Sequence, residues 1–304
     1  MKKKRSKLIE NATPWLFLFP FIFIYLAFSF YPLIYSFYLS LNEWNGIDAI
    51  KFIGFRNYIE ALTRDPYLWS SVKNTLIIGL GYAPLQILTA LVLSVAISSA
   101  VARFTNFYKT AIFLPYITAT VAIGIMCGNI FAWRGGILNH FLLSANIIDD
   151  NVYWLGAPLT SRLIIMLVMF WQDMGYICVL FLAGLSTIPA DYYEAAQIDG
   201  ANAVQTFFRI TIPQLKPVFI FVIVNNVSWL FQVFDIPFII FGRSRPLGGP
   251  DGSVLTPLWY IYDTVFGGKL RYGYASSISY ILFFMIFISV VLVYRVMRKG
   301  SDEA

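Results

Sequence analysis

The chain has 304 residues, of which 59% are hydrophobic and 12% are charged, and its formal net charge is +6. Soluble globular domains carry about a quarter charged residues, so this composition excludes an ordinary soluble protein and predicts an integral membrane protein. The single histidine, His140, has no cysteine or carboxylate at ligand spacing, and we therefore expect no metal site.

Six apolar runs are each long enough to cross about 30 Å of hydrocarbon as a helix, which takes about 20 residues. In chain order they cover residues 15–39, 72–98, 108–132, 161–184, 216–241 and 274–296. No internal repeat or low-complexity linker separates them. The predicted fold class is an all-α polytopic membrane protein, with six transmembrane helices in a single domain covering residues 1–304.

Basic residues at both ends of the chain predict its orientation. Five of residues 2–7 are Lys or Arg, and Arg295, Arg298 and Lys299 follow the last run. Such residues favour the cytoplasmic side, so we expect both termini to be cytoplasmic. The first run is too long for a signal peptide and lacks a small-residue cleavage site, which predicts a retained anchor. The expected external loops are 40–71, 133–160 and 242–273, and the cytoplasmic loops are 99–107 and 185–215.

Prolines inside or near the runs predict bent helices, because neighbouring helices or local kinks can satisfy the backbone groups that proline frees. They are Pro20, Pro32, Pro84, Pro115 and Pro237.

The loop at 185–215 has the pattern of a helical hairpin. Pro189 suits the first turn of a helix that Ser186 or Thr187 could cap, and Asp191 and Glu194 place negative charge near its N-terminus. A glycine, Gly200, then supplies a left-handed C-terminal end.

The faces of this hairpin suggest a docking surface. Positions 192, 195, 196 and 199 share one face of the first helix, where Ala195 and Ala196 leave a shallow surface. A second helical stretch, with apolar residues at 204, 207 and 208, is expected to end before Pro213. One short helix would then project, while the other lies against the bundle or the membrane. The alternative is an amphipathic connector that rests on the bilayer surface.

Polar side chains at membrane depth are costly, and they indicate either function or helix packing. In the fourth run they are Gln172 and Asp173, and in the fifth they are Asn225, Asn226, Ser228, Gln232 and Asp235.

One helical face of the fifth run carries Asn225, Trp229, Gln232 and Ile236, and a second carries residues 228, 232 and 235. Amides beside an indole suit a sugar, whose hydroxyls need hydrogen bonds while its C–H surface stacks on a ring. Packing between helices remains the alternative for all these polar groups.

Charge within the runs bears on the kind of solute. No Lys or Arg lies deep in any run, which favours a neutral solute over an anion. Asp235 is expected to pair with a neighbouring subunit or with Arg243.

Residues 184–217, GLSTIPADYYEAAQIDGANAVQTFFRITIPQLKP, closely resemble the EAA loop of the membrane subunits of ATP-binding-cassette (ABC) importers. Other segments resemble the carbohydrate-importer branch of that family, specifically its MalF-like permeases. They are Glu43-Trp44, FIGFRNYIEAL from Phe52, AIFLPYI from Ala111, GGILNHFL from Gly135, FQVFDIPFII from Phe231, LGGP from Leu247 and YGYASSISY from Tyr272. Residues 243–246 depart from the pattern, since many relatives have a shorter turn there.

The resemblance implies a MetI-like permease fold in the cytoplasmic membrane of a prokaryote. It implies that the hairpin docks into a groove on an ATPase subunit, a role carried over to Glu194, Ala195, Ala196, Asp199 and Gly200. The implied partners are a second permease, an ATPase dimer that binds ATP and Mg, and an extracytoplasmic sugar-binding protein. The implied mechanism is alternating access, driven by closure of the ATPase subunits.

The chain supplies no energy source of its own. It has no G-x-x-x-x-G-K-[ST] loop, because Asp263 and Leu270 occupy the required glycine and hydroxyl positions around Gly268-Lys269. We therefore expect a transport subunit without an ATPase site. The alternatives are a permease for another small neutral solute, an ion-coupled secondary transporter that uses Asp173 and Asp235, or, remotely, an intramembrane enzyme.

Overall fold

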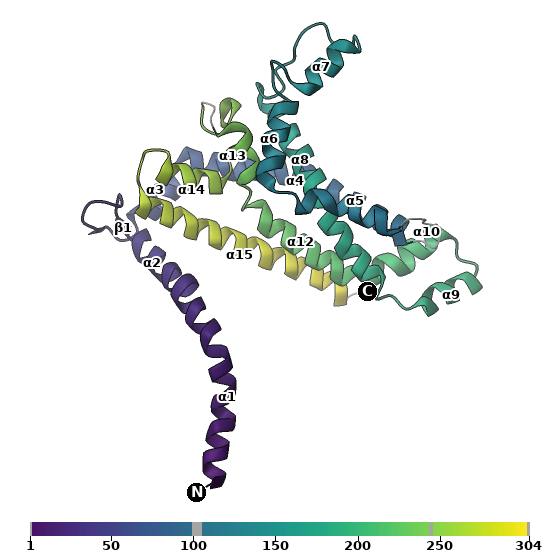
Figure 1. The fold of residues 1–304 in the computed structure, drawn as a ribbon, viewed down its shortest axis with the longest axis horizontal. Helices are drawn as coiled ribbons and strands as arrows, with labels where there is room; N and C mark the ends of the chain where they lie inside the picture. The colour runs from purple at the N-terminus through teal and green to yellow at the C-terminus, as the bar shows by residue number, and fades with distance from the viewer. Residues whose placement is uncertain (1, 99–104, 243–245, 303–304) are drawn as a thin grey trace. The chain divides into compact units, whose positions relative to one another are not determined.

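The computed structural model describes residues 2–98, 105–242 and 246–302, and it is predominantly helical (Figure 1). The chain divides into two compact units. The first comprises Met1–Asp65 and Ile261–Ile281, and the second comprises Pro66–Tyr260 and Leu282–Ala304.

The first unit begins with a long helix and continues into a small polar cap. In chain order it contains α1 (Lys2–Tyr25), a π-helical turn (Leu26–Phe30), α2 (Tyr31–Ser40), the strands β1 (Asn42–Glu43) and β2 (Lys51–Phe52), α3 (Arg56–Thr63), and the parts of α14 (Pro257–Phe266) and α15 (Tyr272–Asp302) within 261–281. The two strands pair in antiparallel fashion. Buried Asn57 joins α3 to the end of α2, because its Nδ2 donates to the Ser40 and Asn42 carbonyls at 3.0 and 2.9 Å.

The second unit holds most of the remaining helices. They are α4 (Pro66–Ser98), α5 (Thr105–Ile117), α6 (Thr120–Ile130), α7 (Ile137–Ser144), α8 (Pro158–Leu185), α9 (Ala190–Ile198), α10 (Ala203–Thr206), a π turn (Phe207–Thr211), α11 (Ile212–Gln214), α12 (Lys216–Leu230), α13 (Asp235–Phe241) and a 3₁₀ turn (Pro250–Gly252).

The core of the second unit lies between α4, α8 and α12. Ala90, Cys178, Phe181 and Val222 are all buried there, and polar side chains of α4 bond to α8 backbone carbonyls within the same region. Helix α5 approaches α8 closely at Gly175, where an added Cβ would lie 2.1 Å from a backbone oxygen of α5. Small residues at helix interfaces allow such close packing in membranes.

The structure reproduces five of the six predicted spans as long apolar helical segments. They are Pro14–Ser40, Pro66–Ser98, Pro158–Leu185, Lys216–Phe241 and Tyr272–Arg298. The run predicted at 108–132 is bent, as its proline indicates, and the bend is sharp, because α5 and α6 meet at an angle of 88°. Helix α5 continues through Pro115 to Ile117, and the break lies at residues 118–119, where Ala119 leaves the helical conformation (φ −54°, ψ 122°).

An ion pair in the first unit shows that the bent pair α5/α6 still counts as one crossing. Arg271 pairs with Glu60 at 2.8 Å, so the segments 41–65 and 261–271 lie on the same side of the membrane. An even number of crossings must therefore separate them. Among the described residues, the three long apolar segments between them give an odd number, which leaves α5/α6 as the candidate for the fourth crossing. The total is six crossings, as predicted.

A buried asparagine organises the loop that contains α7. The side chain of Asn139 is 1% exposed, and its Nδ2 donates to three backbone carbonyls at 2.9 to 3.2 Å. Its Oδ1 accepts from the Val152 N–H and the Trp154 indole. Because every polar atom of this buried amide is bonded, it can hold the loop in one conformation.

Candidate functional site

The hairpin at 185–215 is the first candidate site. Its first helix, α9, begins at Ala190, with Pro189 extended just before it (φ −58°, ψ 138°), one position later than predicted. The predicted caps are wrong, because Ser186 and Thr187 donate to carbonyls in the last turn of α8 at 2.7 Å each. These two hydroxyls therefore bond to the C-terminal turn of α8 and do not cap the N-terminus of α9. Asp191 does lie in the first turn of α9, where the helix dipole favours a carboxylate.

The other end of α9 is closed as predicted. Gly200 has a left-handed backbone (φ 74°), and its N–H donates to the Gln197 carbonyl at 3.1 Å. The Ala201 N–H donates to the Ala196 carbonyl at 2.9 Å. This pair of bonds is the Schellman arrangement, which satisfies two of the carbonyls that a helix end leaves free. The hairpin therefore turns at a fixed point.

The exposed side of α9 differs in part from the prediction. Glu194, Ala195, Asp199 and Gly200 are exposed, whereas Ala196 is only 7% exposed. The shallow surface expected from both alanines is therefore provided by Ala195, while Ala196 packs inside the hairpin. The Glu194 carboxylate forms no hydrogen bond or ion pair with the described residues, so it is available to a partner.

The second limb of the hairpin anchors the first. Asn202 and Gln205 form a capping box that starts α10, with both bonds at 2.9 Å. The Asn-x-x-Gln spacing is itself a sequence signal for the start of a helix. Phe207 packs against the core of the second unit, whereas Phe208 stays exposed. Pro213 does not end this limb as predicted, because it lies within α11.

The limbs are also linked by side chains. The Tyr193 hydroxyl of α9 lies 3.3 Å from the Thr211 hydroxyl at the end of the π turn. One limb of the hairpin therefore packs on the bundle and the other projects from it, as expected (Figure 1).

The polar face of the fifth span is the second candidate site, and its geometry corrects one prediction. Helix α12 ends at Leu230 and α13 starts at Asp235, so no continuous helical face runs from Asn225 to Ile236. Gln232 lies in the break and is exposed, whereas Ile236 is buried. Asn225 and Trp229 remain one turn apart on α12.

The polar side chains of the fifth span bond to their own helix. Asn225, Asn226, Ser228 and Gln232 each donate to the carbonyl four residues earlier, at 2.8 to 3.0 Å. Among the described residues, these four bonds join no second helix. Gln172 differs, because its amide donates to the Thr120 hydroxyl of α6 at 3.0 Å and is 7% exposed. The packing interpretation therefore fits Gln172.

Aromatic rings from three helices form a row that the sequence analysis missed. Trp229 of α12 lies 5.2 Å from Tyr176 of α8, measured between ring centroids, and Tyr176 stacks on Tyr116 of α5 at 4.9 Å. The sequence holds one signal for this row. Tyr176 lies about one helical turn after Asp173, which places it near a polar residue that was already a candidate for contact with the solute. Trp229 is 37% exposed, so part of its ring is free to contact a solute.

The two intramembrane carboxylates occupy different surroundings. Asp173 is half-buried on α8, and Asp235 is exposed in the first turn of α13. The predicted partner Arg243 lies outside the described residues.

Comparison with known proteins decides the family. A family model described as "Binding-protein-dependent transport system inner membrane component" matches residues 87–299, which include both candidate sites. The chain belongs to this family. The permease resembles the lactose transport system permease protein LacF of Rhizobium radiobacter, with 32% identity over 95% of each chain. It also resembles the arabinooligosaccharides transport system permease protein AraP of Bacillus subtilis (strain 168), with 30% identity over 96% of this chain and 90% of the relative.

Solved structures support the same fold. A crystal structure of a bacterial alginate ABC transporter, in complex with an alginate pentasaccharide-bound periplasmic protein, contains a chain that matches with a TM-score of 0.80. The match has 23% identity and covers 96% of each chain. The predicted MetI-like, six-span permease fold is therefore confirmed, and the protein is a multi-pass membrane component of an ABC importer.

Proposed function

We propose that this permease forms half of the translocation pathway of an ATP-driven sugar importer. The hairpin from Glu194 to Gly200 is its contact with the ATPase. The remaining partners are a second permease subunit, an ATPase dimer that holds ATP and Mg, and an extracytoplasmic sugar-binding protein. Both termini and the hairpin face the cytoplasm.

The observation that carries the coupling role is the construction of the hairpin. One limb packs on the core through Phe207, while α9 projects with Glu194 and Ala195 exposed. The Schellman end at Gly200 fixes where the limb turns. A projecting helix on a rigid support transmits movement, provided that it has different contact energies in the two states of the transporter.

The sugar assignment rests on the row of aromatic rings and on the sugars in the relatives' names. Trp229 is partly exposed at the end of this row, supported by Tyr176 and Tyr116, and its ring is of the kind on which the C–H surface of a sugar stacks. Asn225 lies one turn from Trp229 and offers amide hydrogen bonds. LacF and AraP are named for lactose and arabinooligosaccharides, which supports a carbohydrate for this chain.

A first experiment tests the assembly and its substrate. The permease is coexpressed with its candidate partners and reconstituted, and ATP hydrolysis is measured with binding proteins loaded with different mono- and oligosaccharides. Hydrolysis is expected to rise with the true substrate. If no sugar stimulates hydrolysis while another small neutral solute does, the sugar assignment is wrong.

A second experiment tests the hairpin. Glu194→Ala is expected to lower the sugar imported per ATP hydrolysed while the assembly still purifies intact, because the carboxylate has no role in folding the hairpin. The matched control is Asp191→Ala, which removes an exposed carboxylate from the first turn of the same helix, outside the proposed contact. Equal effects of the two substitutions would contradict a specific role for Glu194.

A further inference from the structure

A basic side chain of the second unit, Arg162, bonds only to neutral groups among the described residues. It is the fifth residue of α8, which begins at Pro158. Its Nε donates to the Ser253 carbonyl at 3.0 Å, and its Nη2 donates to the Asn74 side-chain oxygen at 2.9 Å. Arg162 forms no ion pair with a described residue. These contacts therefore orient the guanidinium but do not balance its charge.

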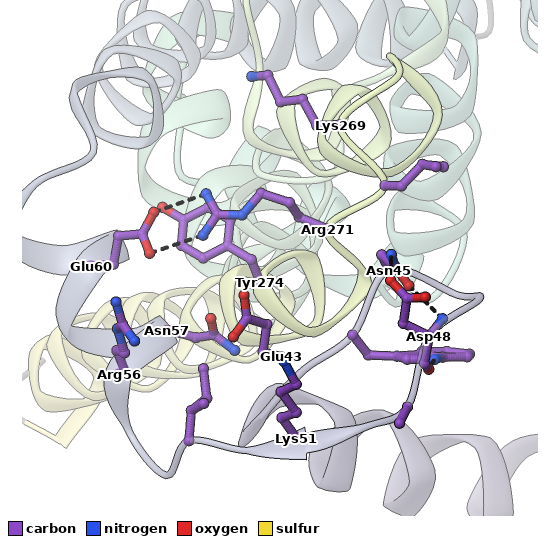
Figure 2. Close-up of a pocket in the computed structure, with 14 residues that line it drawn as sticks. Glu43, Asn45, Asp48, Lys51, Arg56, Asn57, Glu60, Lys269, Arg271 and Tyr274 are labelled. Carbon is purple, nitrogen blue, oxygen red and sulfur yellow. Dashed lines mark hydrogen bonds and ion pairs between the residues drawn. The ribbon is translucent and has the colours of Figure 1, made fainter.

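A second arginine shows how the chain balances a guanidinium elsewhere (Figure 2). In the first unit, Arg271 binds both carboxylate oxygens of Glu60, at 2.8 and 2.9 Å. A carboxylate matches both the charge and the forked N–H donors of a guanidinium. Arg162 has no such partner in the described part of the chain. Asp251, the carboxylate nearest to Ser253 in the sequence, is exposed and forms no ion pair with Arg162.

The position of Arg162 in its helix increases the need for a negative charge. The N-terminal end of a helix carries partial positive charge, which favours anions and disfavours cations. Side chains of a helix lean toward its N-terminus, so a side chain at the fifth position covers the first turn. No side chain caps this end of α8, because Ala157 precedes the helix. The helix and the guanidinium therefore both favour an anion at the same place.

Three buried hydroxyl groups next to these contacts lack hydrogen-bond partners among the described residues. They belong to Thr75, Ser161 and Ser253, which are 1%, 0% and 2% exposed. Ser161 adjoins Arg162 in α8, and Thr75 adjoins Asn74 in α4. Buried hydroxyls are normally paired, and an unpaired one points to a bound water or ion. Water could pair these hydroxyls, but it would leave the charge of the guanidinium unbalanced.

We propose that Arg162 and the hydroxyls of Thr75, Ser161 and Ser253 bind a monatomic anion, chloride, at the N-terminal end of α8. Chloride accepts several hydrogen bonds at once, and each hydroxyl can donate one. A guanidinium has five N–H donors, of which two are used by Ser253 and Asn74, so three remain. Because the hydroxyls are at most 2% exposed, the site suits a single atom and not a phosphate group.

The bound anion connects three segments of the second unit. Asn74 of α4 donates to the carbonyls of Gly252 and Leu255, at 2.7 and 3.2 Å. Arg162 of α8 donates to the carbonyl of Ser253, between them. The segment 252–255 is thus held on the ends of two long helices, and the anion supplies the missing charge and hydrogen bonds at their junction. Since it binds only the folded arrangement, chloride stabilises the folded permease.

The test measures the thermal unfolding midpoint of the full-length permease against chloride concentration, with gluconate replacing chloride at constant ionic strength. Chloride at about ten times its dissociation constant shifts the folding equilibrium about elevenfold, which is expected to raise the midpoint by a few degrees. The rise is expected to saturate, unlike a general salt effect. An equal response to both anions overturns the inference. Neither sugar nor ATPase takes part, so the result is independent of the proposed function.

Substitutions distinguish an anion ligand from a hydroxyl that only fills space. Ser161→Ala is expected to weaken chloride binding about tenfold, because it removes a hydrogen bond to a charged group. Arg162→Gln is expected to abolish the chloride response. The matched control is Ser71→Ala, which removes a buried hydroxyl of α4 that already bonds to the Leu68 carbonyl at 2.7 Å, and it is expected to keep the full response. A wild-type response in Ser161→Ala, or an equal loss in Ser71→Ala, overturns the inference.

A crystallographic measurement locates the ion directly. Bromide replaces chloride chemically and scatters X-rays anomalously. Crystals grown in sodium bromide are expected to show an anomalous peak within hydrogen-bond distance of the Arg162 guanidinium, and the peak is expected to be lost in Arg162→Gln. Density for water alone at this place in the wild type overturns the inference.

Discussion

Replacement of Gly200 by valine tests whether the geometry of the hairpin end, rather than its chemistry, couples the permease to its ATPase. The backbone there is left-handed (φ 74°), and an added Cβ would meet no atom within 4 Å. The cost is therefore conformational and not steric. A residue with a side chain loses about 1–2 kcal/mol in this conformation, and a β-branched residue is expected at the upper end. Since 1.4 kcal/mol is a factor of ten, the docked hairpin becomes up to about 30-fold less populated.

The assay is sugar imported per ATP hydrolysed in proteoliposomes that contain the complete assembly. Gly200→Val is expected to lower this ratio strongly, while the thermal unfolding midpoint of the bundle stays near that of the wild type. Gly200→Asn is the matched control, because asparagine tolerates the left-handed region far better than valine. The reasoning is refuted if valine leaves the ratio unchanged, or if asparagine impairs it as much as valine.

Three further substitutions test the other sites. Trp229→Ala is expected to reduce sugar-stimulated transport about tenfold and Trp229→Phe much less, since a ring face persists; uptake assays that show equal losses would refute stacking. Gln172→Leu removes a buried bond to Thr120 and is expected to lower the thermal midpoint while the ratio of transport to hydrolysis is retained; an unchanged midpoint with lost transport would instead assign Gln172 to the path. Asn139→Leu leaves several buried backbone groups unpaired and is expected to increase proteolysis of residues 131–157; an unchanged cleavage rate would argue against the asparagine as the organiser of that loop.

Local signals predicted the features that depend on neighbouring residues in the chain. Six apolar runs gave the six crossings, because the membrane imposes length and composition on each span separately. Gly200 and Asp191 were placed correctly, because helix ends follow rules that act over a few residues. The EAA pattern then assigned the hairpin to a family that the comparison confirmed.

The features that were missed depend on contacts between distant segments or on competing local effects. Pro115 marked a bend, but its sequence neighbours did not reveal an angle of 88°. The burial of Ala196 depends on how α9 meets the second limb of the hairpin. The rings of Tyr116, Tyr176 and Trp229 come from three different helices, so only packing brings them together.

The hydrogen bonds of the fifth span have a consequence for the speed of transport. The side chains of Asn225, Asn226, Ser228 and Gln232 each bond to a carbonyl of their own chain at 2.8 to 3.0 Å. For Asn225, Asn226 and Ser228, a hydroxyl can take over the side-chain donor without leaving a buried polar atom unpaired, because the carbonyl that is left lies within α12 and keeps its main-chain bond. Gln232 differs, because its own N–H donates to the Trp229 carbonyl at 2.9 Å. On the proposed pathway, a solute would exchange hydrogen bonds of similar, low strength along this helix and would not bind tightly at one point. Such a pathway would favour fast transport, and it would leave most of the selectivity to the proposed binding protein.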